Sequence, residues 1–341
     1  MKLITFVVPC YNSEDYMDRC IDSLLIAGDE AEILIVNDGS SDGTSAIAHR
    51  YEKMYPDIVR VVDKANGGHG SGVNVGLQLA VGQYFKVVDS DDWLDRRCLK
   101  KLLCNLRRWH EENLSPDLVI CNYIYDHLYE PEKSVTMSYD NIFQVGRISE
   151  WDDMGVFRPS QYLIMHALYF RTEILRKAGV CLPEHMFYVD NIFACQPLHL
   201  VEKICYLNLD LYHYFIGRED QSVNESVHIR RIDQQLYVTR FIAQHVDLRA
   251  ARARSRKLER YLIRNLSIMM TISSIYLLKI GTPDALQKRR RLWDDLKAYD
   301  PNVYYHLRCA TLSGLTMLPG TVGRKIAVEG YELAQHLYAF N

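Results

Sequence analysis

The chain has 341 residues, of which 48% are apolar and 24% are charged, the balance of an ordinary soluble globular protein. This length allows one large or two modest domains. The opening segment MKLITFVVPCYN does not read as a signal peptide, because its apolar run ends at Pro9 and no cleavage site follows. The nine cysteines show no C-x-x-C pair and no metal-type spacing, so we expect core thiols in a reducing compartment, the cytoplasm.

Charge is distributed unevenly along the chain. Residues 1–225 hold 21 Lys and Arg against 34 Asp and Glu, whereas residues 226–341 hold 19 against 9. The basic residues of the second region concentrate in 249–260 and 288–291. This shift in composition predicts two regions with different functions, divided at 225/226.

Apolar runs alternate with helical periodicities in the first region. Strands are predicted at 3–8, 32–36, 58–63 and 84–88. A helix is expected after each of the first three, the first of them capped by Asn12 or Ser13. Near-continuous apolar strands alternating with helices predict an α/β fold with a mainly parallel sheet covered on both faces. Ligands bind such sheets outside the carboxyl ends of the strands.

Four polar stretches follow these strands, and all of them are expected at one crevice. They are Tyr11, Asp38, the glycine-rich segment 66–76, and the acidic run Asp89-Ser90-Asp91-Asp92. The glycine spacing does not match the dinucleotide fingerprint, and no phosphate-binding P-loop is present. Carboxylate oxygens suit a hard divalent cation that carries a diphosphate. The alternative for the acidic run is a solvated loop that caps a helix beginning near Asp95.

Together, VVPCYNSE, VNDGSSDGT, NGGHGSGVNVG and VVDSDDWL resemble the signature of glycosyltransferase family 2 on a GT-A (Rossmann-like) fold, over about residues 3–225. The resemblance implies inverting transfer of a sugar from a nucleotide diphosphate donor, usually a UDP-sugar, with Mn²⁺ or Mg²⁺. It places nucleotide-sugar binding in residues 1–125 and the acceptor side in residues 126–225. One departure is Val73, which stands where many members carry arginine.

The same resemblance assigns donor-binding residues. Pro9 and Tyr11 would line the nucleobase pocket, Asp38 would hold the base edge, and the D-x-D of Asp89 and Asp91 would meet ribose and metal. The full set in this part of the chain is Pro9, Tyr11, Asn12, Asp38, Asn66, Gly67, Gly68, Asp89, Ser90 and Asp91.

Two later motifs also match the family. In FYVDNIFACQPLHL, Asp190 resembles the general base that deprotonates the acceptor hydroxyl, the alternative being a helix N-cap. In LYHYFIGREDQSVNE, His213 would ligate the metal or meet the diphosphate, the alternative being packing among tyrosines. Arg218 and Ser222 would contact the diphosphate oxygens. His166, in HALYFRTEILRKAG on the acceptor side, is expected to be structural, the alternative being a contact with the acceptor.

Beyond residue 226 the pattern is helical. The uncharged stretch between Arg264 and Lys279 has 14 residues, fewer than the ~20 that span a bilayer, so a buried helix is expected. The basic segments would hold the protein at anionic headgroups on the inner face of the cell membrane. A solvated basic face, an acceptor site and a homodimer interface are alternatives. Nucleic acid is not expected, because no binding module accompanies the charge.

The favoured function is transfer of a sugar to a glycan or a lipid-linked saccharide in surface polysaccharide synthesis. A sugar nucleotidyltransferase would need a basic glycine-rich loop at the first strand, and VVPCYNSEDY is not one. The alternative from another class is a non-catalytic partner that binds nucleotide-sugar or membrane while another subunit transfers. Asp89, Asp91 and Asp190 argue against it, because a binding partner needs no general base.

Overall fold

The structure is a computed structural model that describes residues 1–127, 130–217 and 225–338. The chain forms two compact units. Unit 1 comprises residues 1–156 and 163–217, and unit 2 comprises residues 157–162 and the chain from 218 onward. A short internal segment of the first region therefore belongs to the helical unit. The functional roles assigned above to residues 1–225 and 226–341 remain predictions.

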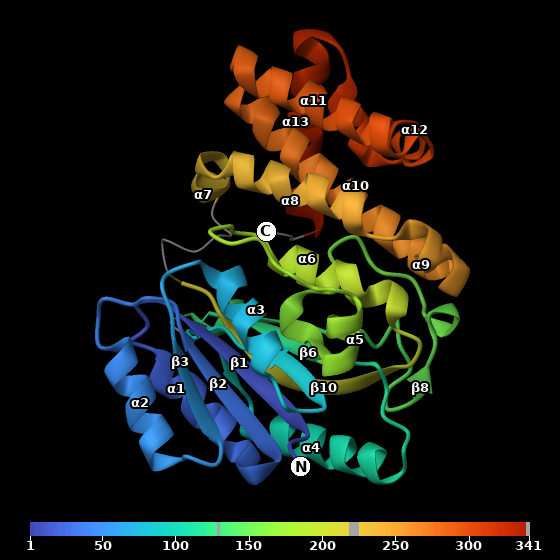
Figure 1. The fold of residues 1–341 in the computed structure, drawn as a ribbon. Helices are drawn as coiled ribbons and strands as arrows, with labels where there is room; N and C mark the ends of the chain where they lie inside the picture. The colour runs from blue at the N-terminus through green and yellow to red at the C-terminus, as the bar shows by residue number, and fades with distance from the viewer. Residues whose placement is uncertain (128–129, 218–224, 339–341) are drawn as a thin grey trace. The chain divides into compact units, whose positions relative to one another are not determined.

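Unit 1 is built on one ten-stranded sheet (Figure 1). The central path has the order β3-β2-β1-β4-β9-β6-β10-β5, while β7 pairs with β6 and β8 pairs with β10. In chain order the strands are β1 Ile4–Cys10, β2 Ala31–Asn37, β3 Val59–Asp63, β4 Tyr84–Val87, β5 Trp93–Leu94, β6 Leu118–Asp126, β7 Val135–Met137, β8 Ile148–Ser149, β9 Leu168–Arg171 and β10 Ile204–Phe215.

The predicted α/β fold is confirmed, with a sheet that is parallel in one half and mixed in the other. Strands β3, β2, β1 and β4 are all parallel. Between β1 and β2 the pairing runs from Ile4 opposite Ala31 to Cys10 opposite Asn37. Strand β9 then runs antiparallel between β4 and β6. Both β1 and β2 are buried along their whole length, which explains their continuous apolar sequence.

Helices flank this sheet: α1 Met17–Leu24, α2 Thr44–Met54, α3 His69–Leu79, α4 Arg96–Glu111, α5 Thr172–Lys177 and α6 Asp190–Cys195. Helix α3 lies very close to β1. A Cβ added to Gly76 would lie 2.3 Å from a methyl carbon of Val7, and one added to Gly72 would lie 3.0 Å from Pro9. These glycines therefore serve close helix–strand packing. The N-cap of α4 is Asp95, whose carboxylate accepts the N–H of Cys98 at 2.8 Å, so the acidic run Asp89–Asp92 does not cap this helix.

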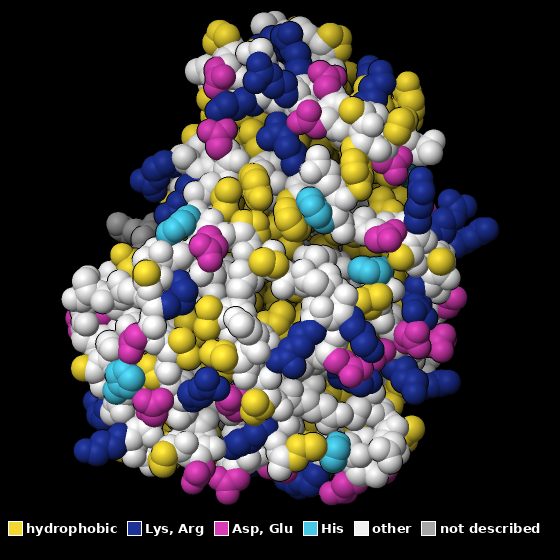
Figure 2. Space-filling view, viewed as in Figure 1, with side chains coloured by type: hydrophobic (Ala, Val, Ile, Leu, Met, Phe, Trp, Pro, Cys, Tyr) yellow, Lys and Arg dark blue, Asp and Glu magenta, His cyan; other side chains and the backbone are white. Residues whose placement is uncertain are grey.

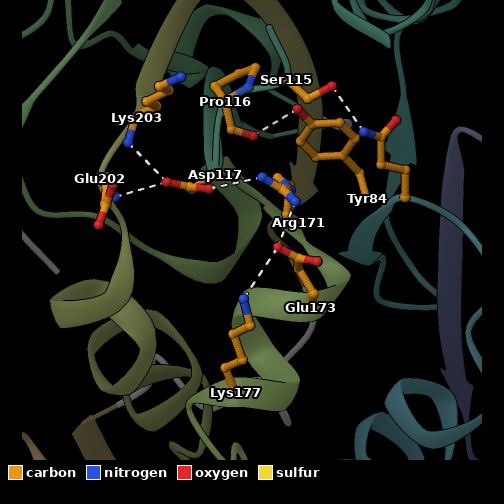
Figure 3. A network of polar contacts seen from close by, with 10 residues as sticks. Tyr84, Ser115, Pro116, Asp117, Arg171, Glu173, Lys177, Glu202 and Lys203 are labelled. Atoms are coloured by element: carbon orange, nitrogen blue, oxygen red, sulfur yellow. Dashed lines mark hydrogen bonds and ion pairs between the residues drawn. The ribbon is translucent and has the colours of Figure 1, made fainter. Parts of the chain in front are cut away.

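A polar network ties the antiparallel strands to their neighbours at the other end of the sheet (Figure 3). The Asp117 carboxylate accepts the backbone N–H groups of Glu202 (2.9 Å) and Lys203 (3.0 Å), and it meets Arg171 at 3.3 Å. The hydroxyl of Tyr84 donates to the carbonyl of Pro116 at 2.7 Å. These contacts join β4 and β9 to the segments that lead into β6 and β10.

Unit 2 is helical, as predicted. Its elements are α7 Glu225–Arg230, α8 Ile232–His245, α9 Leu248–Arg254, α10 Arg256–Ile280, α11 Pro283–Tyr299, α12 Pro301–Ala310, the 3-10 helix η6 Leu312–Met317, and α13 Gly320–Tyr338. Helix α10 is central, and it packs against α8, α9, α11 and α13. The indole N–H of Trp293 donates to the hydroxyl of Ser274 at 3.1 Å in this core.

Helix α10 contains the uncharged stretch predicted to be a buried helix. Among the described residues it is the one helix that is long and apolar enough to cross a membrane, yet 67% of its apolar window is buried inside the protein. Met270, Ile275 and Leu277 are each at most 1% exposed. Protein atoms rather than lipid therefore surround most of this helix.

All nine cysteines are free, in agreement with the absence of a disulfide framework. Five are buried, as expected for core thiols. The expectation is wrong for Cys104, Cys181 and Cys309, which are exposed.

Candidate active site

The carboxyl ends of the parallel strands bring the predicted residues to one edge of the sheet. Tyr11 follows β1, Asp38 follows β2 and Asp89 follows β4, and these three strands are neighbours. Pro9 is buried within β1, whereas Tyr11 is 55% exposed. An exposed ring beside a buried strand end is available for stacking.

Asp38 holds the glycine-rich segment in place. Its carboxylate, 3% exposed, accepts the backbone N–H groups of Gly67 (2.9 Å) and Gly68 (2.7 Å), and it contacts the ammonium of Lys64 at 2.6 Å. The side chain of Asn66 donates to the carbonyl of Asp38 at 2.9 Å. Gly68 has a φ of +83°, which explains the glycine. The structure thus shows Asp38 as an anchor of this segment, and its contact with a base edge remains a prediction.

Asn12 and Ser13 do not cap α1, so that expectation is wrong. The N-cap of α1 is Tyr16, and no side chain bonds to the free N–H groups there. Asn12, with a φ of +49°, instead accepts the backbone N–H of Ser41 at 2.9 Å. The hydroxyl groups of Ser13 and Ser90 lie 2.8 Å apart. These side chains join the loops that follow β1, β2 and β4.

His69 lies at the centre of the charged cluster. It is the first residue of α3, and its Nε2 lies 2.9 Å from a carboxylate oxygen of Asp89. Burial lowers the pKa of His69, but the charge and hydrogen bond of Asp89, with the charges of Asp190 and Asp91, raise it overall. Burial raises the pKa of Asp89. The electrostatic interactions with His69, His166 and Lys86, together with the hydrogen bond from His69, lower this pKa by more, to about 2. His69 and Asp89 therefore each favour the charged form of the other.

Asp190 belongs to the same cluster. It is the first residue of α6, where Val189 occupies the N-cap position, so the alternative of an N-cap does not hold. Burial raises the pKa of Asp190, His69 lowers it and Asp89 raises it, and the balance is a raised value. A carboxylate whose pKa is raised toward neutrality is better matched to proton transfer.

Asp92 is separate in role from its acidic neighbours. It is fully buried, and it accepts the hydroxyl of Tyr212 at 2.5 Å and the backbone N–H of Phe215 at 2.8 Å. Burial raises its pKa well above the usual range, and the charges of Asp91 and Asp89 add to this. Asp92 therefore ties the acidic loop to the end of β10.

Behind this loop lie two buried groups that we did not expect at the site. Lys86, fully buried on β4, donates to the carbonyls of Met165 (2.9 Å) and His166 (2.5 Å). Burial lowers its pKa to about 7. The ring of His166 stacks on Tyr212 with centroids 4.8 Å apart, and its Nδ1 is buried without a hydrogen-bond partner. Burial lowers the pKa of His166 to about 4, so its imidazole is neutral and able to ligate a metal.

One group among the described residues has the arrangement of a metal site. The ligand atoms of Asp89, Asp92 and His166 all lie within 4.8 Å of one another. Two carboxylates with a neutral imidazole suit a divalent cation, and the unpartnered Nδ1 of His166 leaves it a donor atom to offer. The residues present therefore fit Mn²⁺ or Mg²⁺. Of the predicted ligands, Asp89 belongs to this group, while Asp91 and His213 do not, and their metal roles remain predictions.

The remaining predicted contacts are placed as follows. Nδ1 of His213 lies 2.7 Å from the carboxylate of Asp126, and its ring stacks on Trp93 at 4.9 Å. Arg218 and Ser222 lie outside the described residues.

Arg19 is a site residue that the sequence reasoning missed. Its guanidinium lies 3.6 Å from the centre of the Trp93 ring and donates to the carbonyl of Asp91 at 2.9 Å. A helix residue seventy positions before the D-x-D gives no sequence signal for this contact. The signal for His69 was available, because it stands inside the glycine-rich segment that precedes a helix.

Comparisons with known proteins agree with this geometry. The family model "Glycosyl transferase family 2" matches residues 5–160. Putative glycosyltransferase EpsH of Bacillus subtilis is 29% identical over 62% of this chain, and the match spans 60% of its own length. An uncharacterized glycosyltransferase of Mycoplasma pneumoniae, the MG025 homolog, is 44% identical over 64% of this chain and 70% of its own length.

Among solved structures, S. aureus TarS 1–349 in complex with UDP-GlcNAc has a TM-score of 0.69 at 20% identity, covering 98% of this chain and 92% of TarS 1–349. At this identity the likeness concerns the fold, and it extends through the helical unit. With the Mycoplasma relative, the family model and the strand-end cluster in agreement, the chain belongs to glycosyltransferase family 2 and has a GT-A fold.

Proposed function

We propose that the protein is a metal-dependent, inverting glycosyltransferase that moves a sugar from a UDP-sugar to a hydroxyl of a glycan or lipid-linked acceptor in surface polysaccharide synthesis. The observation that carries this proposal is the cluster of Asp89, His69 and Asp190, whose charges act on one another at the carboxyl ends of the strands. Family membership supports sugar transfer, and the UDP-GlcNAc bound to the TarS neighbour supports a UDP-sugar donor.

The donor would lie along the strand ends. Tyr11 would stack on the uracil above buried Pro9, as its 55% exposure allows. The Asn66–Gly68 segment, held by Asp38, would lie beside the base and ribose. Ser90, positioned by Ser13, and Asn12, positioned by Ser41, would complete the donor contacts.

Asp89, Asp92 and His166, whose ligand atoms lie within 4.8 Å of one another, would hold the divalent cation, and Asp91 of the D-x-D would join them. A bound Mn²⁺ or Mg²⁺ supplies positive charge that neutralises the diphosphate of the donor. Asp92 would also hold the loop, since it accepts the hydroxyl of Tyr212 and the N–H of Phe215 on β10. His69 would replace part of the positive charge that Val73 cannot supply.

Asp190 would be the general base. The acceptor oxygen attacks the anomeric carbon, the bond from that carbon to the diphosphate oxygen breaks, and the acceptor proton passes to the Asp190 carboxylate. A single displacement of this kind inverts the configuration. UDP leaves with the bonding electrons, and His69, whose pKa is raised by Asp89, would help to neutralise that charge.

The test is UDP binding by calorimetry with and without Mn²⁺, together with a hydrolysis screen of UDP-sugars. Wild type should bind UDP more tightly with Mn²⁺, and Asp91→Ala should lose this difference. Asp57→Asn, which alters an exposed carboxylate of the same unit, is the matched control and should behave as wild type. UDP affinity that is independent of Mn²⁺ in wild type would contradict the metal assignment, and failure of every UDP-sugar would contradict the donor class.

The wider assignments belong to the same proposal. UDP-sugars are made in the cytoplasm, so the reaction would take place there, at the inner face of the membrane if the acceptor is lipid-linked. On this proposal, donor binding and catalysis take place in unit 1.

A further inference from the structure

Exposed aliphatic side chains gather at one corner of unit 2. They come from η6 and the start of α13: Leu312 is 75% exposed, Leu315 47%, Val322 70% and Ile326 53%. Ala327, Val328 and Tyr331 of α13 pack inward against residues of α10 and α11. Because Val322 and Ile326 are four positions apart, they share a second, outward face. An apolar face of this kind marks a contact with something outside the chain.

This corner is one continuous piece of structure. A Cβ on Gly314 would lie 2.0 Å from the carbonyl oxygen of Arg308, and a Cβ on Gly323 would lie 2.7 Å from Cβ of Leu318. The end of α12, η6 and the first turn of α13 are therefore folded tightly onto one another. We call residues 308–326 the η6–α13 corner.

Arginines gather at the same corner. Arg289 of α11 is 8% exposed, its Nη1 donates to the carbonyl of Thr316, and its Nε is buried without a hydrogen-bond partner. Arg290 and Arg324 lie near enough for their charges to add to the effect of burial in lowering its pKa. In the space-filling view, Lys and Arg side chains lie over α11 and α13 among apolar side chains and a smaller number of Asp and Glu side chains (Figure 2).

These arginines lack acidic partners. Residues 301–328 contain no Asp or Glu. Within the part of the chain that the structure describes, no ion pair involves Arg289, Arg290, Arg308 or Arg324. Glu329, the carboxylate nearest in sequence to Arg324, lies 3.6 Å from Lys325. A negative charge from outside the protein would therefore complement this corner.

We propose that the η6–α13 corner docks on an anionic lipid bilayer. The four aliphatic side chains would enter the boundary between headgroups and acyl chains, and the arginines would meet the headgroup phosphates. A second copy of the chain fits less well, because a two-fold interface would bring the same unpaired cations together. The inference rests on exposure and charge in unit 2, and it is independent of the proposed transfer reaction.

This placement differs from the basic segment 249–260 expected from sequence. Among the described residues, none of the exposed large apolar side chains lies in that segment. Arg252 also lies 3.7 Å from the carboxylate of Glu259. Charge without exposed apolar area gives weaker attachment than both together.

The test is flotation of the full chain with phosphatidylcholine vesicles, with and without phosphatidylglycerol. Wild type should float with the anionic vesicles at low salt and be released as salt rises. Each basic side chain at the surface is worth roughly fivefold in partitioning, so Arg290→Gln/Arg324→Gln should bind about 25-fold more weakly. Leu312→Ser/Val322→Ser should also lose binding. The matched control, Arg249→Gln/Arg252→Gln, removes two exposed arginines of the same unit and should retain it.

Three outcomes would overturn the proposal: wild type that fails to float at low salt, a control pair that loses as much binding as the corner pair, or corner variants that convert a dimer into a monomer by light scattering. The last result would assign the corner to a second copy. All substituted side chains except Arg324 are exposed, and the single variant Leu312→Glu keeps the test valid if the double variants misfold.

Discussion

Charged side chains are arranged differently in the two units. In unit 1 the buried carboxylates Asp38, Asp92 and Asp117 each accept at least two hydrogen bonds from backbone or side-chain donors. In unit 2 the buried Arg289 retains an unpartnered Nε, and its neighbouring arginines have no acidic partner among the described residues.

This difference shows that a charged side chain can either hold neighbouring loops in position or remain available to bind an external ligand. A buried carboxylate that accepts hydrogen bonds from fixed donors keeps its position, because the donors offset the loss of hydration. Such groups hold the loops of unit 1 around Asp89 and Asp190. A cation without a carboxylate partner keeps its charge available to an external anion.

Asp190→Asn tests the acidic side of this comparison with the largest expected effect. An amide cannot accept the acceptor proton, so kcat should fall about 10²–10⁴-fold while UDP affinity stays the same. Steady-state transfer assays and calorimetry on the same samples give both values. Near wild-type turnover would show that the base lies elsewhere in the cluster.

His69→Gln sharpens the same point through pH dependence. The base acts only when deprotonated, so the rate falls as pH drops through the pKa of Asp190, which is raised above its ordinary value. His69 lowers that pKa, so its removal should move the acid limb of kcat/KM to higher pH. His49→Gln, an exposed histidine paired with Glu52 and Asp63, should leave the limb in place. If the acid limb of kcat/KM does not move in His69→Gln, the charge of His69 does not influence the pKa of Asp190.

Tyr212→Phe tests whether the buried carboxylates stabilise unit 1. Asp92 would lose the hydroxyl that lies 2.5 Å away and remain fully buried. The free energy of unfolding should fall by about 1–3 kcal/mol in urea titrations. Tyr305→Phe, at a 54% exposed position of unit 2, should change it by less than about 0.5 kcal/mol. Equal effects at the two positions would remove the distinction drawn between the units.

Arg240→Gln should have the smallest effect. It breaks an ion pair of unit 2 with Asp295 at 2.7 Å, between side chains that are 33% and 47% exposed. Solvent screens such a pair, so the loss of stability should be about 0.2–1 kcal/mol. A loss larger than that of Tyr212→Phe would show that surface charge in unit 2 is structural after all.

Local patterns predicted much of unit 1. The four predicted strands correspond to β1 to β4, and the residues that follow β1, β2 and β4 meet at one edge, because parallel neighbours share the direction of their carboxyl ends. The cap at Asp95 was also predictable, since a capping bond spans only three residues. The strand and helix of β9 and α5 can also be read from the local pattern of 166–179, but the pairing of β9 with β4 cannot, because it joins residues far apart in sequence.

The cluster was predicted only in part for a similar reason. The family pattern identified Asp89 and Asp190. The position of His166 depends on Lys86 of β4, which donates hydrogen bonds to the carbonyls of Met165 and His166. Arg19 reaches Asp91 from α1 through a stacking contact with Trp93. Asn12 failed as a cap because its backbone adopts a positive φ, which a capping residue does not use.

The segment Phe157–Tyr162 has a consequence for how such proteins can recombine. Its Phe157 ring lies 4.5 Å from that of Tyr261, and the guanidinium of Arg264 donates to the carbonyls of Arg158, Pro159 and Gln161 at 2.8–2.9 Å. A gene fusion that exchanged everything after residue 217 would leave this hexapeptide without its partners. The helical unit therefore cannot be exchanged as a C-terminal segment alone. A chimera that folds must carry residues 157–162 together with the helices, and the same constraint applies to their replacement in evolution.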